Sequence, residues 1–210
     1  MLSTPLTRSS LLAAAHDLAA RDRTLRSIFE QHGPPPLWSR PQGFPTLVRI
    51  ILEQQVSLAS AASVFARLQE NIVPFKPDRF VEMGDSGLRS LGLTRQKTAY
   101  LLHLSESILE RRIHISRLAR MNDSEAKTAL VQLKGIGSWT ADIYLLMALR
   151  RPDIFPASDL ALAVSWARIK KLSVTPTPDE LTTMAEKWRP YRSVAARMLW
   201  QSYLAQRERR

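Results

Sequence analysis

The fold is decided by one short stretch, Leu133-Lys134-Gly135-Ile136-Gly137-Ser138-Trp139-Thr140-Ala141, which lies between two helical patterns. Two glycines on either side of one apolar residue permit a tight turn from one helix into the next. We expect Ile136 to anchor this turn in the core. The backbone N–H groups at the start of the second helix would then point outward, where they can bind a phosphate. A ligand-free hairpin between two packed helices, with glycine ending the first, explains the same residues.

The composition limits the partners and cofactors. The chain has 210 residues, of which 45% are hydrophobic and 23% charged, as in an ordinary globular protein. Lys and Arg number 30 against 19 Asp and Glu, and the resulting net charge of +11 attracts nucleic acid. The absence of cysteine excludes disulfides and thiolate-bound zinc or iron–sulfur clusters. No apolar run approaches the roughly 20 residues that cross a bilayer, so we expect a cytoplasmic, DNA-associated protein without membrane contacts.

Hydrophobic periodicity predicts an all-α fold. Apolar residues recur at helical spacing along most of the chain, and proline and glycine separate these stretches. The two strand-like stretches, at residues 113–115 and 172–174, are too short to form a sheet. We expect about ten helices in one domain of two lobes over residues 1–210. A single N-terminal helix, at residues 7–31, would cross back onto the second lobe.

A second informative stretch, at about residues 152–160, contains an aspartate. A helix from Trp139 to Arg150 and a proline-bounded loop would bring Asp159 back alongside the hairpin at about residues 133–141. Asp159 also directly precedes a predicted helix, so the role of N-cap explains it as well. Asp142 and Asp153 are weaker candidates for a functional carboxylate.

Together the hairpin and the aspartate resemble the helix-hairpin-helix DNA glycosylase superfamily. Its pattern is L-x-G-I/V-G followed, after a helix and a Gly/Pro-rich loop, by an aspartate. Three further stretches are similar to motifs of this superfamily in the expected order: Ile50-Ile51-Leu52-Glu53-Gln54-Gln55-Val56-Ser57, Leu91-Gly92-Leu93-Thr94-Arg95-Gln96-Lys97 and Trp188-Arg189-Pro190-Tyr191-Arg192-Ser193-Val194-Ala195. Among the branches of the superfamily, the chain most resembles 3-methyladenine DNA glycosylase II, from roughly Phe44 to the C-terminus.

The resemblance implies an activity and a catalytic residue. It implies hydrolysis of the N-glycosidic bond of alkylated purines in duplex DNA by base flipping, which leaves an abasic site for base excision repair. This bond breaks through an oxocarbenium-like sugar, and we assign Asp159 the role of the carboxylate that stabilises the positive charge. DNA and the flipped base would lie in the cleft between the lobes.

Two departures from the superfamily bear on the activity. Members that also cleave the DNA strand carry a nucleophilic lysine where this chain has Trp139, so we expect a monofunctional glycosylase. The bacterial alkyladenine enzyme also has an N-terminal mixed α/β domain, for which this chain is too short.

Candidate binding residues follow from the same resemblance. Aromatic faces attract a cationic alkylated base, and the candidates are Trp139, Tyr144, Trp188 and Tyr191, although core packing would explain each of them. Gln55 is the candidate wedge that fills the gap left by the flipped base, although it could instead cap the turn before Ser57. The other DNA-binding candidates are Lys134, Gly135, Gly137, Ser138, Arg95 and Lys97.

The resemblance implies no organic cofactor and no catalytic metal. Family members hold a monovalent cation among hairpin carbonyls, so the backbone of Gly135 and Gly137 is a candidate site for Na⁺ or K⁺. The predicted partner is double-stranded DNA with damaged bases, bound by a monomer. Two alternatives stay open: a glycosylase for another base lesion, and a non-catalytic helix-hairpin-helix protein that only binds DNA.

Overall fold

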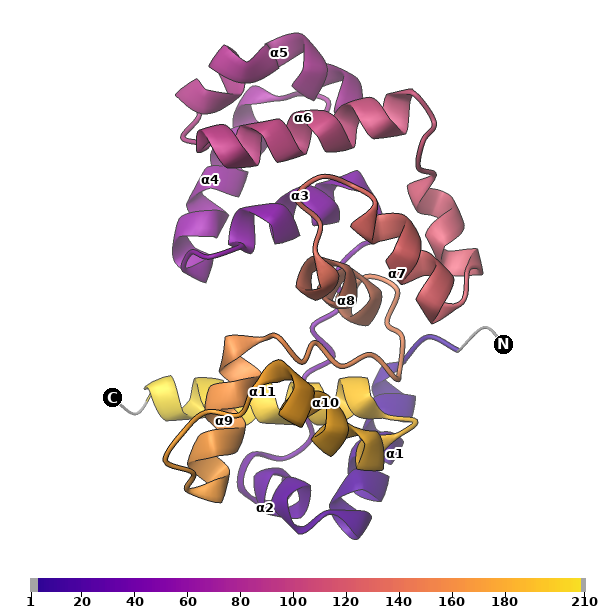
Figure 1. Ribbon diagram of the computed structural model, residues 1–210, viewed down its shortest axis with the longest axis vertical. Helices are drawn as coiled ribbons and strands as arrows, with labels where there is room; N and C mark the ends of the chain where they lie inside the picture. The colour runs from indigo at the N-terminus through magenta and orange to yellow at the C-terminus, as the bar shows by residue number, and fades with distance from the viewer. Residues whose placement is uncertain (1–3, 209–210) are drawn as a thin grey trace. The chain divides into compact units, whose positions relative to one another are not determined.

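The computed structural model describes residues 4–208, and over this range the regular secondary structure consists of helices joined by loops (Figure 1). The described residues form eleven α-helices and two 3-10 helices and contain no β-strand. The predicted all-α fold is therefore confirmed. The chain divides into two compact units: unit 1 is Arg40–Tyr144, and unit 2 combines the N-terminal segment up to Ser39 with residues from Leu145 onward.

Unit 1 contains the hairpin. Its elements are α3 (Phe44–Glu53), α4 (Leu58–Asn71), α5 (Pro77–Ser90), α6 (Arg95–Leu109), η1 (Ile115–Arg120), α7 (Asp123–Val131) and most of α8 (Ser138–Met147). Helix α3 is apolar on most sides, and its residues Leu47, Ile50 and Ile51 are buried in the core. Several helices begin at a side chain that accepts a backbone N–H, as Asn122 Oδ1 does from Glu125 at 2.9 Å.

Unit 2 contains the second predicted stretch. Its elements are α1 (Arg8–Arg21), α2 (Arg23–His32), the end of α8, α9 (Leu160–Lys170), α10 (Pro178–Ala185), η2 (Glu186–Trp188) and α11 (Arg192–Glu208). Helix α11 packs against α1, α2 and α9. The long C-terminal helix therefore joins α1 and α2 to the segment that follows the hairpin.

The predicted single helix at residues 7–31 is wrong, because the chain breaks at Asp22. Asp22 has an extended backbone and caps α2, where its Oδ1 accepts the N–H groups of Thr24 at 2.8 Å and Leu25 at 3.1 Å. Its Oδ2 lies 3.0 Å from Nε1 of Trp188 and 2.8 Å from Nζ of Lys187. The Asp22 side chain accepts N–H groups that are otherwise free at the start of a helix. The chain therefore forms two helices that meet at Asp22 instead of the one predicted helix.

Arg197 is a cation buried inside unit 2. Its guanidinium donates to three carbonyl oxygens, those of Leu37 at 2.9 Å, Ser193 at 3.0 Å and Leu146 at 2.8 Å. Burial lowers its pKa from 12.5 to about 9. The three acceptors lie on the N-terminal segment, α11 and α8, so one side chain joins three distant parts of the sequence.

None of the helices between residues 4 and 208 is both long and apolar enough to span a membrane.

Asp22 makes stability depend on acid pH. Burial raises the pKa of this carboxyl, but the hydrogen bonds from Lys187, Trp188 and Leu25 outweigh burial and lower it from 3.8 to about 2. The stabilisation is complete above about pH 4 and is lost as the pH falls through about 2, a contribution of about 2 kcal/mol. We expect Asp22→Asn to lose about this amount at pH 7 and to show a flatter acid dependence in urea unfolding.

The matched control for this prediction is Asp17→Asn. Asp17 lies on α1, the helix that ends just before Asp22, and its side chain is 51% exposed beside Arg21, so its loss changes stability by less than about 0.5 kcal/mol. Equal losses in the two variants contradict the role of Asp22.

Candidate functional site

The hairpin turn joins α7 to α8 and has the geometry that its glycines predict. Gly135 has a left-handed φ of +85°, and a Cβ added there would collide with the ring of Tyr100. Ile136 is buried, as predicted, and donates its N–H to the carbonyl of Leu133 at 3.0 Å. A Cβ at Gly137 would meet no heavy atom within 4 Å. The turn therefore requires glycine at position 135 and leaves space beside the backbone at position 137.

Gln54 holds the hairpin in place, a role that the sequence analysis did not predict. Its Nε2 donates to the carbonyl of Gly135 and to Oγ1 of Thr140, both at 2.8 Å. Gln54 follows α3, so this amide joins the end of α3 to both sides of the turn. The only signal in the sequence is a pair of adjacent glutamines, and periodicity does not tell which of the two points inward.

Gln55, the predicted wedge, points outward from the same segment. It is exposed and has a left-handed φ of +56°. Ser57 caps α4 itself, because its Oγ accepts the N–H of Ser60 at 3.1 Å. The N-cap of α4 is therefore Ser57 and not Gln55. The neighbouring side chains of Val56 and Leu58 are also exposed, so this turn presents one amide between apolar groups.

The predicted phosphate contacts divide into two groups. Lys134, Arg95 and Ser138 are exposed, and Arg95 and Ser138 lie in the first turns of α6 and α8. Lys97 instead donates from Nζ to the carbonyl of Leu52 at 2.5 Å, near the C-terminal end of α3. Burial lowers the pKa of this ammonium. Lys97 thus has a structural partner, and its contact with phosphate stays only a prediction.

Asp142 forms an ion pair with a lysine of unit 1. Its carboxylate is buried and lies 2.8 Å from Nζ of Lys127 on α7. The hydroxyl of Ser138 also donates to it at 3.4 Å. This pair joins α7 to α8 on the two sides of the turn, which explains Asp142 without catalysis.

Asp159 is the N-cap of α9 and also contacts a second helix. Its Oδ1 accepts the N–H of Leu162 at 3.2 Å and the indole N–H of Trp200 at 3.1 Å. Asp159 is half-buried, and Trp200 is a buried residue of α11. Sequence analysis missed Trp200, because nothing local relates it to a residue 41 positions earlier.

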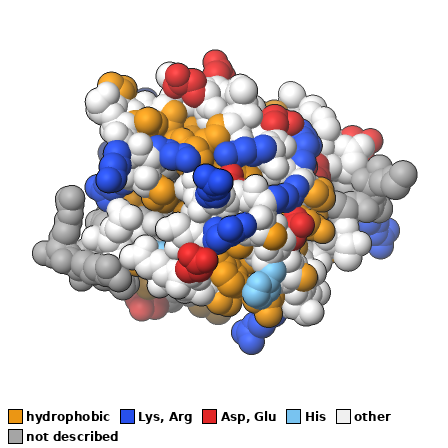
Figure 2. Space-filling view, turned by 90° about the horizontal axis from the view of Figure 1, so that it is seen from below, with side chains coloured by type: hydrophobic (Ala, Val, Ile, Leu, Met, Phe, Trp, Pro, Cys, Tyr) orange, Lys and Arg blue, Asp and Glu red, His pale blue; other side chains and the backbone are white. Residues whose placement is uncertain are grey.

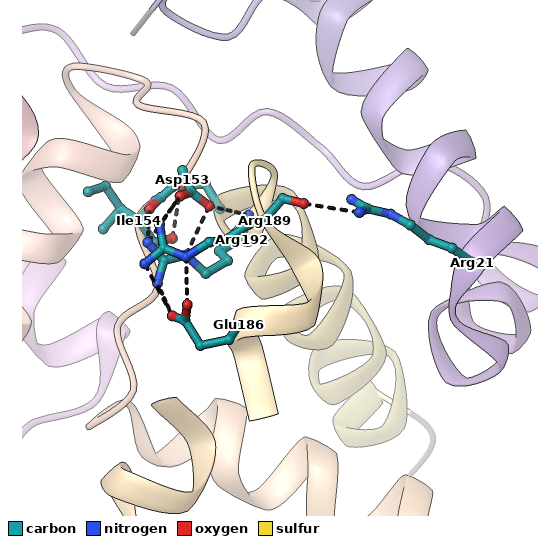
Figure 3. Close-up of polar contacts among 7 residues, drawn as sticks. Arg21, Asp153, Ile154, Glu186, Arg189 and Arg192 are labelled. Atoms are coloured by element: carbon teal, nitrogen blue, oxygen red, sulfur yellow. Dashed lines mark hydrogen bonds and ion pairs between the residues drawn. The ribbon is translucent and has the colours of Figure 1, made fainter. Parts of the chain in front are cut away.

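A network of charges holds the loop that leads to Asp159 (Figure 3). Asp153 forms ion pairs with Arg192 at 2.9 Å and with Arg189 at 2.8 Å, and both arginines also pair with Glu186. The hydroxyl of Ser193 accepts the N–H of Ile154 and donates to its carbonyl, both at 2.9 Å. Asp153 is thus engaged in structure.

The network also explains the motif at residues 188–195. Its residues Arg189, Arg192 and Ser193 all bind the loop at residues 153–154, so the motif anchors the segment before Asp159. This role was not predicted from the sequence, which assigned the aromatic residues of the motif to the base.

Two of the four predicted stacking residues are corrected. Trp188 is 0% exposed, donates its indole N–H to Asp22 and packs against Trp166 at a ring distance of 5.6 Å. Tyr144 is also 0% exposed, its hydroxyl accepts the N–H of Gly43 at 3.0 Å, and burial raises its pKa. Both are core residues because packing covers their faces. Trp139 and Tyr191 are partly exposed.

The candidate cation site at the hairpin has carbonyls that are already engaged. The carbonyl of Gly135 accepts from Gln54, and that of Gly137 accepts the N–H of Ala141 at 3.1 Å. A carbonyl oxygen has two lone pairs, so each retains one for a cation. Among residues 4–208, no cluster of three or more His, Cys, Asp or Glu could hold a metal ion.

Comparison with known proteins places the chain among DNA repair proteins. Residues 48–190 match the family model described as HhH-GPD superfamily base excision DNA repair protein. A putative DNA-3-methyladenine glycosylase of Bacillus subtilis, YfjP, is 29% identical over 85% of this chain. This chain spans only 65% of the length of that protein.

Two similar proteins come from Schizosaccharomyces pombe. The alkylbase DNA glycosidase-like protein mag2 is 27% identical over 90% of this chain and 92% of its own length. The solved structure of the 3-methyladenine DNA glycosylase Mag1 in complex with abasic DNA has a TM-score of 0.83 at 25% identity, covering 90% of this chain and 95% of that chain.

Substitution of the two hairpin glycines tests whether the turn requires glycine at position 135. Gly135→Ala combines a strained φ with a collision against Tyr100, so we expect it to lower the free energy of unfolding by about 2 kcal/mol or more. Gly137→Ala is the matched control, two residues away with open space, and costs about 0.5 kcal/mol as a weaker N-cap residue. Urea unfolding of both variants measures the difference, and equal costs contradict the special role of Gly135.

Proposed function

Because the chain belongs to the HhH-GPD superfamily of base excision DNA repair proteins, we propose that it is a monofunctional DNA glycosylase for alkylated purines. Bases of the 3-methyladenine type are the first substrates, excised from duplex DNA to leave an abasic site. The names of the B. subtilis and S. pombe relatives support this substrate class. The protein acts as a monomer on damaged double-stranded DNA.

The observation that carries the proposal is the fixed carboxylate of Asp159. It follows the hairpin in the order that the superfamily pattern requires, and two N–H groups from different helices bind its Oδ1. A carboxylate held in this way needs little reorganisation to stabilise a positive charge that develops beside it.

The negative charge of Asp159 acts on the sugar as the glycosidic bond breaks. As the bond between C1′ and the base nitrogen breaks, the base leaves with the electron pair and the sugar becomes oxocarbenium-like. Asp159 stabilises that cation, water adds to C1′, and the proton lost from the water passes to solvent. A base alkylated at a ring nitrogen is already cationic and leaves as a neutral molecule, so no general acid is required.

The residues that bind DNA follow from charge and exposure. Figure 2 shows one face of the molecule, on which Lys and Arg side chains lie among hydrophobic, uncharged and acidic ones, and the whole sequence has a net charge of +11. Lys134, Arg95 and Ser138 contact phosphate, with the backbone of Gly135 and Gly137. Gln55 enters the stack once the base has left it. Trp139 of unit 1 and Tyr191 of unit 2 are partly exposed, and each stays a candidate stacking residue for the flipped base.

Two further features refine the proposal. Trp139 occupies the position of the lyase lysine, which supports hydrolysis without strand cleavage. A Na⁺ or K⁺ ion on the free lone pairs of the Gly135 and Gly137 carbonyls would add positive charge beside a bound phosphate. We assign no step of the reaction to that ion.

A panel of duplexes, each with one lesion, tests the proposed function. Incubation with the protein and then alkali should cleave strands that contain 3-methyladenine-type bases, and strands left without alkali should stay intact. Borohydride should trap no protein–DNA adduct. Excision of only oxidised, deaminated or mismatched bases would establish the first alternative, and binding without excision the second.

Asp159→Asn tests the catalytic carboxylate. Asparagine still caps a helix but lacks the charge, so we expect the single-turnover excision rate to fall about a hundredfold or more while duplex binding is preserved. Asp179→Asn, at the exposed start of α10 in the same unit, is the matched control and should excise at the wild-type rate. Near wild-type excision by Asp159→Asn contradicts the assignment.

Gln55→Ala tests the wedge. A wedge acts only after the nucleotide leaves the stack, so we expect weaker binding to duplexes with a lesion or an abasic analogue and unchanged binding to intact duplex. Fluorescence anisotropy measures both affinities, and the melting temperature shows whether the fold is intact. Equal losses on both duplexes would remove Gln55 from the site.

A further inference from the structure

Trp200 lies at the centre of a constellation in unit 2 that includes the proposed catalytic carboxylate. Its indole N–H donates to Oδ1 of Asp159 at 3.1 Å, and its ring contacts Trp38 edge-on at a centroid distance of 6.4 Å. The indole nitrogen of tryptophan is a donor and never an acceptor. If neither oxygen of Asp159 accepted this N–H, the indole nitrogen of Trp200 would be left without a hydrogen bond, which is unfavourable for a buried donor.

The two hydrogen bonds to Oδ1 constrain the carboxylate in different ways. The N–H of Leu162 belongs to the same helix start as Asp159, so it holds the oxygen near the end of α9. Trp200 lies on α11, so its N–H fixes the direction of the oxygen relative to a second element. A carboxylate that only capped α9 would be less constrained than one that accepts hydrogen bonds from two helices.

The position of Trp200 is itself fixed on several sides. The hydroxyl of Ser165, buried on α9, donates to the carbonyl of Leu199 at 2.8 Å, which sets how α9 and α11 align one residue before Trp200. Arg197, one turn earlier on α11, binds the carbonyl of Leu37 next to Trp38. Trp38 has a left-handed φ of +43°, a conformation that a bulky residue adopts only where its surroundings hold it.

We propose that Trp200 is a positioning residue for excision, which acts by fixing the carboxylate of Asp159 through its indole N–H. This inference rests on the proposed function. It assigns a role in the rate of excision to a buried residue of α11. Loss of the N–H should lower the rate of bond breakage and leave DNA binding unchanged.

Trp200→Phe and a double-mutant cycle test the inference. Phenylalanine keeps most of the ring and removes the N–H, so we expect the single-turnover excision rate to fall about tenfold. Affinity for an abasic-analogue duplex should change by less than about twofold. In the Asp159→Asn background the same substitution should change the residual rate by less than about twofold, because its effect passes through Asp159. Equal losses in both backgrounds would overturn the inference.

Trp166→Phe is the matched control. Trp166 lies in the same unit and is 8% exposed, as Trp200 is, but its contacts are with Trp188 and the ammonium groups of Lys170 and Lys187. We expect its excision rate to match wild type, with a loss of melting temperature similar to that of Trp200→Phe. A tenfold slower Trp166→Phe would show that any lost indole in this unit slows excision.

A second measurement does not depend on activity or on the folding of Trp200→Phe. With ¹⁵N-labelled tryptophan, the chain gives one indole N–H resonance for each of its five tryptophans. We expect Asp159→Asn to shift one of these resonances and Asp22→Asn, which changes the acceptor of Trp188, to shift a different one. If Asp159→Asn shifts none, the hydrogen bond is absent and the inference fails. If the shift occurs but the wild type excises no alkylated purine, the proposed function fails while the contact stands.

Discussion

The buried guanidinium of Arg197 is the interaction on which unit 2 depends. A charge removed from water must be compensated, and here the compensation comes from three carbonyl oxygens on the N-terminal segment, α8 and α11. These segments are far apart in sequence, and each must be in place for the cation to be satisfied. The lower pKa of this group reflects the cost of its burial. Deleting the side chain would remove one donor from a carbonyl oxygen on each of the three segments.

Hydrogen bonds connect Arg197 to the loop that ends at the proposed catalytic aspartate. Arg197 binds the carbonyl of Ser193, and the hydroxyl of Ser193 binds both backbone groups of Ile154, at the start of the loop that ends at Asp159. The ion pairs of Asp153 hold the same loop from its other side (Figure 3). Since rigid carboxylates stabilise a developing charge better than mobile ones, the polar network of unit 2 would serve the proposed chemistry as well as stability.

The hairpin of unit 1 is also held by hydrogen bonds from a single side chain, in this case a neutral amide. Gln54 satisfies the carbonyl of Gly135 and the hydroxyl of Thr140, while the ring of Tyr100 occupies the space that a side chain at position 135 would need. The backbone is held at Gly135 and open at Gly137. Exposed candidate phosphate contacts and a rigid turn suit a surface that binds a DNA backbone, whose phosphates are regularly spaced.

The sequence by itself determined the features that depend on neighbouring residues. Capping acts over three residues, so the N-cap role of Asp159 was predictable. The two glycines predicted the tight turn at residues 135–137, and the order of the motifs indicated the family. Tertiary structure alone decided which chemically identical side chains meet. Trp188 and Trp200 are both tryptophans near an aspartate in space, yet packing placed Trp188 on Asp22 and Trp200 on Asp159. Gln54 and Gln55 are adjacent, yet the left-handed backbone at Gln55 directs one amide inward and the other outward. Such choices depend on contacts between residues 41 to 166 positions apart, and no local pattern contains them.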